Sequence, residues 1–197
     1  MTKYIAIDTE LGGLPPECSL LTAAFVVADE SFNIVDSLEI KLKHSTYTLT
    51  TEGMNVNKID IFKHDEEAEE FKVCQDKIRR FLYKHGKRNP DLLAVPDVGV
   101  DYLIPVGLAV ASDIARLKAA GFSLPCLSGQ VRDLGVIAGF LRDSGLVHSG
   151  FPGSLEGMFK ALLGDTLEKD PIFHTALGDA VASIRVYDQF VYNLSVL

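Results

Sequence analysis

The sequence predicts one α/β domain over residues 1–197, built on a mixed β-sheet covered by helices. Three strand-like segments with short connections lie within the first 42 residues, and short connections favour an antiparallel meander. A helix-like segment, a strand-like run, a second helix and another strand-like run follow, before several helices. The chain shows no internal repeat, low-complexity tract or linker, and its length suits a single domain.

The strands of the first half are expected where apolar residues run together or alternate. Residues 3–7 form a short apolar run, and residues 19–28 form a longer run rich in Ala, Val and Phe. Residues 34–42 carry an apolar side chain at every second position from 38, which predicts a half-buried strand.

A change to helical periodicity predicts an amphipathic helix over residues 65–83. Its apolar residues recur at helical spacing, and its acidic start and basic end suit the helix dipole. Gly86 predicts the end of this helix. Residues 87–101 then read as a loop.

The second half alternates between strands and helices. A fourth strand is expected at 102–106, a short helix at 113–120, and a fifth strand at 124–131, where Pro125 and Gly129 interrupt the apolar run.

Three more helices are expected at 134–143, 155–163 and 175–194. Ser154 is a good N-cap for the second of them, and Gly164 is a good C-terminal stop.

The bulk composition excludes several protein classes. No apolar run is long enough to span a bilayer, and the N-terminus leads into a strand without a secretory signal, so a cytoplasmic protein without a membrane partner is expected. The three cysteines, Cys18, Cys74 and Cys126, are too far apart for a zinc-thiolate site or a disulfide framework. The net charge of −8 argues against a broad nucleic-acid-coating surface, but not against an enzyme that grips a chain end.

Two carboxylates, Asp8 and Glu10, end the first predicted strand. Side chains two apart on a strand point to the same face, and ligands of α/β sheets often lie at strand carboxyl ends. Close carboxylates repel unless a cation or a proton lies between them, and Mg²⁺ and Mn²⁺ prefer oxygen ligands. Taken alone, Asp-x-Glu is common and is more often a solvated strand end.

Two further features supply acidic groups and a histidine. Asp113 follows the fourth predicted strand, where an N-cap is the simpler interpretation. His174 precedes the last predicted helix and Asp179 lies about one turn into it. Imidazole is suited to general-base chemistry near neutral pH, although a surface His and a capping Asp occur at this interval by chance.

The joint order of these features resembles the DEDDh branch of the 3′→5′ exonucleases, which includes oligoribonuclease, RNase T and the proofreading subunits of DNA polymerases. The resemblance covers nearly the whole chain. Its motifs are Asp8-Thr9-Glu10, the later Asp113, and His174-Thr175-Ala176-Leu177-Gly178-Asp179-Ala180, close to the family's His-x-Ala-Leu-x-Asp-Ala. It implies a ribonuclease H-like fold, with a mixed five-stranded sheet flanked by helices.

The resemblance also implies roles for individual residues. Two divalent cations, Mg²⁺ or Mn²⁺, would be bound by Asp8, Glu10, Asp113 and Asp179, with His174 as the general base of a two-metal hydrolysis. The substrate would be the 3′ end of single-stranded RNA or DNA, and the product a nucleoside 5′-monophosphate. The terminal 3′-hydroxyl would lie near Leu11 and Gly12, with Leu11 wedged against the last base. Because several relatives pair, a homodimer is compatible with the resemblance.

The sequence departs from the family before Asp113. Leu108 and Ala109 stand where a His-Asn pair is common, which removes side-chain hydrogen bonds that would fix the loop or touch the substrate. Two alternatives therefore stay open: a catalytically weak or inactive module that binds nucleic acid or a protein partner on the same fold, and a phosphodiesterase of very short oligonucleotides.

A basic cluster stands out on this acidic chain. It has two interpretations, a track for a nucleic-acid backbone or the solvated basic end of a helix. Its members are Arg79, Arg80, Lys84, Lys87 and Arg88.

Overall fold

The structure, a computed structural model, describes residues 3–13, 18–86, 102–164 and 172–195. The loop predicted at 87–101 lies outside these ranges, as do two members of the basic cluster. Within the described ranges, no helix is both long enough and apolar enough to cross a membrane.

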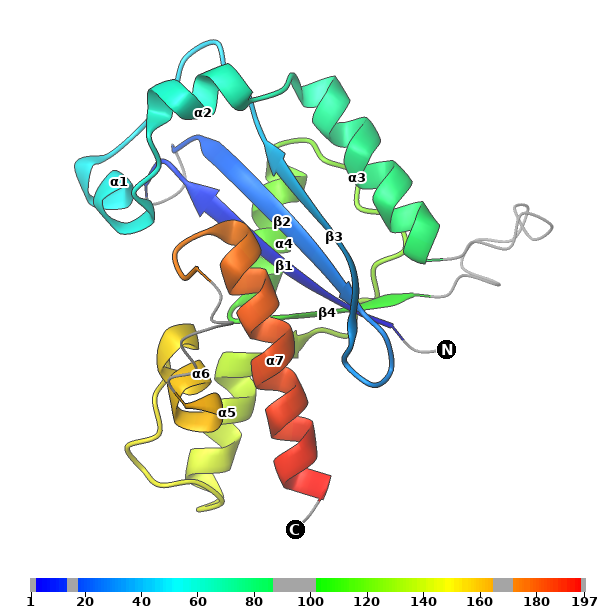
Figure 1. Ribbon diagram of the computed structural model, residues 1–197, viewed down its shortest axis with the longest axis vertical. Helices are drawn as coiled ribbons and strands as arrows, with labels where there is room; N and C mark the ends of the chain where they lie inside the picture. The colour runs from blue at the N-terminus through cyan, green and yellow to red at the C-terminus, as the bar shows by residue number, and fades with distance from the viewer. Residues whose placement is uncertain (1–2, 14–17, 87–101, 165–171, 196–197) are drawn as a thin grey trace, which may run out of the picture.

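A mixed five-stranded sheet forms the centre of the fold, as predicted (Figure 1). The strand order is β3-β2-β1-β4-β5. β1 pairs antiparallel with β2 and parallel with β4, so it lies in the middle of the sheet. The strands are β1 (Lys3–Leu11), β2 (Leu20–Ala28), β3 (Ile34–Lys41), β4 (Leu103–Gly107) and β5 (Arg132–Asp133).

Helices cover both faces of the sheet (Figure 1). α7 crosses one face against β1 and β2, with α6 packed beside it, and α3 and α4 lie on the other face. The helices are α1 (Thr51–Asn57), α2 (Ile61–Glu67), α3 (Phe71–His85), α4 (Val110–Ala119), α5 (Leu134–Asp143), α6 (Leu155–Leu163) and α7 (Ala176–Ser195).

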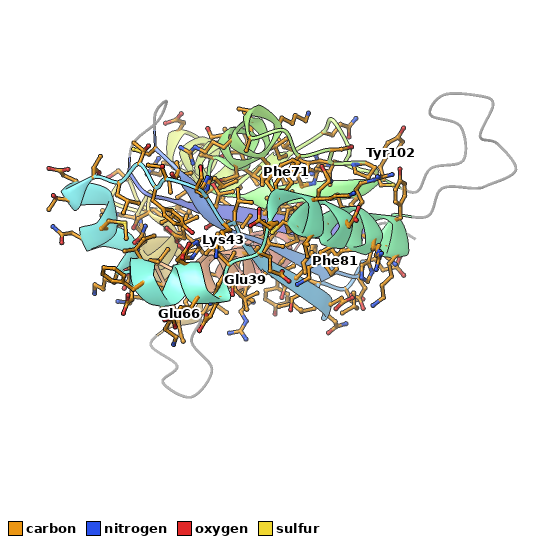
Figure 2. The ribbon with its side chains drawn as sticks, turned by 90° about the horizontal axis from the view of Figure 1, so that it is seen from above. Glu39, Lys43, Glu66, Phe71, Phe81 and Tyr102 are labelled. Atoms are coloured by element: carbon orange, nitrogen blue, oxygen red, sulfur yellow. The ribbon has the colours of Figure 1, made fainter. Side chains whose placement is uncertain are left out.

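The alternation of side chains along the central strands divides the core into two clusters. Ala6 and Ala24 pack on the α7 side, whereas Ile7 and Phe25 pack on the α3 and α4 side. Every residue of β2 is buried, because both faces of this strand are covered. Phe71, at the start of α3 (Figure 2), packs against Phe122, with ring centroids 4.6 Å apart and ring planes tilted by 35°.

The single helix predicted at 65–83 is wrong, because α2 ends at Glu67 and α3 begins at Phe71. Between them, Glu69 pairs with the end of β3: its backbone N–H donates to the Lys41 carbonyl over 2.8 Å, and its carbonyl accepts from Lys43 over 2.9 Å. Two long-range backbone bonds thus outweigh the helical periodicity of the sequence at this point.

The boundaries around β4 and β5 also differ from prediction. Only Leu127 of the predicted fifth strand, 124–131, forms a bridge, to Leu103, and the regular strand is Arg132–Asp133. The helix expected to begin at Asp113 begins at Val110, because Ala109 adopts a left-handed conformation (φ 55°) that turns the chain earlier. The short helix α1 was not expected.

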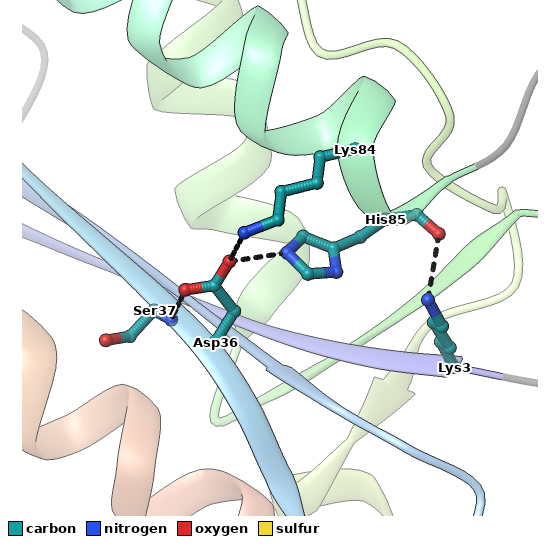
Figure 3. Close-up of polar contacts among 5 residues, drawn as sticks. All are labelled: Lys3, Asp36, Ser37, Lys84 and His85. Carbon is teal, nitrogen blue, oxygen red and sulfur yellow. Dashed lines mark hydrogen bonds and ion pairs between the residues drawn. The ribbon is translucent and has the colours of Figure 1, made fainter.

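A polar cluster ties the end of α3 to the sheet (Figure 3). The Asp36 carboxylate of β3 accepts from Lys84 Nζ over 2.7 Å and contacts His85 Nε2 at 2.8 Å. Lys3 Nζ of β1 donates to the His85 carbonyl over 3.4 Å. Hydrogen bonds from Lys84 and then His85 lower the pKa of Asp36 to about 2. Lys84, one of the basic cluster, therefore has a structural partner.

Asp36→Asn is expected to destabilise the fold by about 1 kcal/mol at pH 7, since the charged pair is partly open to solvent. A lowered carboxyl pKa stabilises the folded state above its unfolded pKa, so the difference from wild type should fade as pH falls from about 4 toward 2. Urea unfolding across this pH range measures it, with the exposed Glu30→Gln as control. A stability difference between wild type and Asp36→Asn that persists at pH 2 would contradict the lowered pKa of Asp36.

Candidate active site

The site begins at the carboxyl end of β1. Asp8 and Glu10 lie opposite Ala24 and Thr22 of β2, so both carboxylates project from the face of the sheet that α7 covers. A pocket opens here, lined by Glu10 and by residues 174–176 at the start of α7. The two-residue spacing on a central strand therefore places both acids at an open edge of the core, as predicted.

Asp179 joins this pair from the first turn of α7. One ligand oxygen from each of Asp8, Glu10 and Asp179 lies within 4.8 Å of the others. The Asp179 carboxylate is hydrogen-bonded by the backbone N–H of His174, while its buried Oδ1 has no partner among the described residues. An unpartnered buried carboxylate oxygen in a group of acids fits a cation ligand.

Burial and neighbouring negative charges raise the carboxyl pKa values in this group of acids. Burial first, then the Asp113, Asp179 and Glu10 carboxylates, raise the pKa of Asp8 well above its usual range. Burial and the neighbouring Asp179 and Asp113 raise the pKa of Glu10 to about 7. Burial also raises the pKa of Asp179. Such acids ionise together at neutral pH only when a cation compensates their charge, so this set of oxygen ligands fits a divalent cation.

Asp113 approaches the group from the opposite side of the sheet. It lies in the first turn of α4 and is buried, and its Oδ1 accepts from Thr9 Oγ1 over 2.6 Å and from Arg116 Nη1 over 3.4 Å. Burial raises its pKa to about 6, against the lowering effect of Thr9 and Arg116. The structure thus brings three of the four predicted acids within ligand distance of one another and holds the fourth on a threonine.

Thr9 and Arg116 are polar partners that the motif did not identify. Thr9 separates the two acids in sequence and points to the α4 face, where Asp113 lies. Arg116 follows Asp113 by three residues, which is one helical turn, so its i,i+3 spacing was the available signal.

His174 lies at the edge of the site in a left-handed conformation (φ 63°) just before α7. Its side chain is about half exposed (52 %), and its Nε2 lies 4.0 Å from Glu156 Oε2 of α6. Together with Glu10 it lines a pocket of about 240 Å³ between the open end of the sheet face, α2 and the start of α7. A histidine here has access to solvent and to the acidic group.

Leu11, the last residue of β1, and Gly12 after it are the predicted substrate contacts, and both are hydrogen-bonded to α1 or to its N-cap residue. The Leu11 carbonyl accepts from Asn57 Nδ2 over 2.8 Å, and the Gly12 carbonyl accepts from the Thr50 N–H over 2.7 Å. A Cβ on Gly12 would lie 2.6 Å from the Thr48 carbonyl oxygen, so glycine permits close approach of the chain's own backbone. Leu11 lines a second pocket with Arg116.

The departure at Leu108 and Ala109 has a packing counterpart. Leu108 packs against the core cluster on the α7 side, and Ala109 takes the left-handed turn that starts α4. An apolar contact thus stands where a polar pair is common in the DEDDh exonucleases, the family that the sequence resembles.

Without a divalent cation, raised carboxyl pKa values favour the folded state at low pH. This stability is fully present below about pH 4 and is lost as pH rises toward 7, the pKa of Glu10. A fixed Mn²⁺ concentration, 100 times the Kd at pH 8, should therefore raise the unfolding temperature most at pH 8, by about 5–10 °C. Thermal unfolding at pH 5.5 and 8, with and without Mn²⁺, measures the effect. An equal rise at both pH values would contradict it.

Among the comparisons with known proteins, only the comparison with solved structures gives matches. No protein-family model and no curated protein matches the sequence. Cell-death related nuclease 4 (CRN-4) superposes with a TM-score of 0.69 at 15 % identity, covering 96 % of this chain and 64 % of that protein. E. coli exonuclease I, solved with a dA16 oligonucleotide, superposes with a TM-score of 0.67 at 14 % identity, covering 100 % of this chain and 46 % of that protein. Exonuclease I from Methylocaldum szegediense superposes with a TM-score of 0.65 at 18 % identity, covering 96 % of this chain and 40 % of that protein.

The chain therefore has a ribonuclease H-like α/β fold with a cluster of carboxylates at the carboxyl end of its central strand. More particularly, its fold is that of CRN-4 and exonuclease I over nearly its whole length. It spans less than two thirds of each of these proteins.

Proposed function

We propose that this chain is a metal-dependent 3′→5′ exonuclease, a phosphodiester hydrolase acting on single-stranded RNA or DNA. The observation that carries the proposal is the convergence of Asp8, Glu10 and Asp179 within 4.8 Å, with pKa values raised by burial and mutual repulsion. The fold it shares with exonuclease I, which has been solved in complexes with a dA16 oligonucleotide and with ssDNA, supports the substrate class.

Within this proposal, Asp8, Glu10, Asp113 and Asp179 hold the cations. When bound, two Mg²⁺ or Mn²⁺ ions would lower the pKa of a water and neutralise charge on the phosphate and on the leaving 3′-oxygen. Asp113 can join the ligand set through Oδ2, because the hydrogen bonds from Thr9 and Arg116 both end on its Oδ1. The buried walls of the site keep these carboxylates clustered at one edge of the sheet.

His174 is proposed to take the proton from the attacking water. Its imidazole is about half exposed to solvent, next to the acidic group, and its Nε2 lies 4.0 Å from the Glu156 carboxylate. Attack on the last phosphodiester then releases a nucleoside 5′-monophosphate. Leu11 and Gly12, at the carboxyl end of β1, are proposed to contact the terminal nucleotide.

A second function is favoured by one observation: Asp113 lies outside the group of three acids whose ligand oxygens are within 4.8 Å of one another. If that arrangement persists with cation, the site is incomplete and the chain is a module that binds nucleic acid or a protein partner. Turnover separates the two functions: an exonuclease degrades ends, whereas a binding module retains them intact.

A panel of RNA and DNA oligonucleotides with free and blocked 3′ ends tests the proposal. With Mg²⁺ or Mn²⁺, free 3′ ends should be shortened stepwise, and blocked ends and EDTA-treated reactions should remain intact. Dinucleotides in the same panel test the phosphodiesterase of short oligonucleotides. Tight binding of every oligonucleotide without any shortening would favour the binding module.

A further inference from the structure

A buried hydroxyl lies next to the proposed cation site. Thr22 is the one polar residue of β2, and it is 6 % exposed. Its Oγ1 has no hydrogen-bond partner among the described residues. Folded proteins rarely leave a buried polar atom in this state, and valine would fill the same space without the cost.

The register of the sheet shows which group this hydroxyl faces. Thr22 lies opposite Glu10 on β1 and opposite Lys41 on β3, so the three side chains form one row on the α7 side of the sheet. Directly opposed residues of antiparallel strands have Cβ atoms about 4.5–5.5 Å apart. All three residues line the 240 Å³ pocket that also contains His174.

Of the two neighbours, only Glu10 can accept a hydrogen bond. Lys41 carries donors alone, and its ammonium is already paired with Glu67. No described residue donates a hydrogen bond to the Glu10 carboxylate in this structure, where its oxygens are grouped with those of Asp8 and Asp179. The Thr22 hydroxyl, which has no acceptor among the described residues, therefore lies opposite the Glu10 carboxylate, which has no donor among them.

We infer that Thr22 is a positioning residue for Glu10: its hydroxyl donates to the carboxylate oxygen that the bound cation leaves free. This inference rests on the proposed function, because it requires cation at Glu10. Ligating carboxylates in proteins are commonly hydrogen-bonded by a second group, which fixes their orientation. Thr22 supplies that group from the neighbouring strand, at a position fixed by the sheet.

The test compares Mn²⁺ binding by wild type, Thr22→Val and Thr22→Ser, using titration calorimetry without nucleic acid. Thr22→Val keeps the side-chain shape and removes the hydroxyl, so it should bind Mn²⁺ about tenfold more weakly. Thr22→Ser restores the donor and should keep most of the affinity. Lys63→Gln, on the exposed rim of the same pocket, is the matched control and should bind as wild type does.

Thermal unfolding in EDTA separates positioning from folding. Because the hydroxyl has no partner in this state, Thr22→Val should unfold at the wild-type temperature or above it, and only the gain from Mn²⁺ should shrink. Equal Mn²⁺ affinity of wild type and Thr22→Val would overturn the inference, as would a lower unfolding temperature of Thr22→Val in EDTA. A wild type that binds no Mn²⁺ would overturn the proposed function as well.

Discussion

Asp8→Asn is expected to reduce metal-dependent cleavage by about 10³-fold or more, which corresponds to a loss of about 4 kcal/mol of transition-state stabilisation. Asp8 lies at the centre of the acidic group, and its pKa is raised by burial and by three neighbouring carboxylates. The amide is a weaker ligand and carries no charge. Single-turnover rates on a labelled oligonucleotide, at several Mn²⁺ concentrations, measure the loss.

The same substitution should leave the fold at least as stable as wild type in EDTA at pH 8. Without cation the clustered acids repel one another unless some of them hold a proton at pH 8, whereas an amide is neutral without one, so Asn at this position relieves the repulsion. Asp36→Asn is the matched control, because it changes an Asp of the same sheet that is bonded to Lys84 and His85. Asp36→Asn should lose stability and keep activity. An Asp8→Asn protein that is active, or that is unfolded in EDTA, would contradict the assignment of Asp8 as a cation ligand.

His174→Ala is expected to lower kcat by about 10²–10⁴-fold while leaving Mn²⁺ affinity close to that of wild type. The imidazole lies at the edge of the acidic group, where it faces Glu156 and solvent and is not one of the three clustered ligands. Its loss should therefore affect proton transfer more than cation binding. Steady-state kinetics and Mn²⁺ titration on the same preparation measure the two effects.

His148→Ala provides the control for this second substitution. His148 is exposed in the loop after α5, where its Nδ1 accepts from the Gly150 N–H over 3.0 Å, so its removal should leave kcat unchanged. A His174→Ala variant with wild-type kcat would remove His174 from the proposed chemistry. A variant that loses Mn²⁺ binding in parallel would make His174 a ligand instead.

The part of the fold that follows local periodicity was predictable. The buried runs of β1 and β2 and the alternation of β3 gave a mixed sheet, and the Asp8 to Glu10 spacing placed both acids on one face. Asp179 was expected one turn into the last helix and lies there. These features depend on the strand and helix periods, which are encoded within a few residues.

Features that depend on distant partners were not predictable. The break at Glu69 comes from pairing with Lys41 and Lys43, far along the chain. The hydrogen bond from Thr9 to Asp113 joins residues 104 positions apart. Thr22 faces Glu10 only because of the β1–β2 register. None of these relations has a period or motif in the sequence, since each is created when the sheet assembles.

The central claim is tested most directly by identifying the products released from a single strand labelled at its 3′-terminal nucleotide. With Mg²⁺, the wild-type chain should release labelled nucleoside 5′-monophosphate as the first product, and the Asp8→Ala/Glu10→Ala double variant should release none. Equal release by both proteins, or an intact strand with wild type under Mg²⁺ and Mn²⁺, would contradict the assignment of this acidic group as the active site of a 3′→5′ exonuclease.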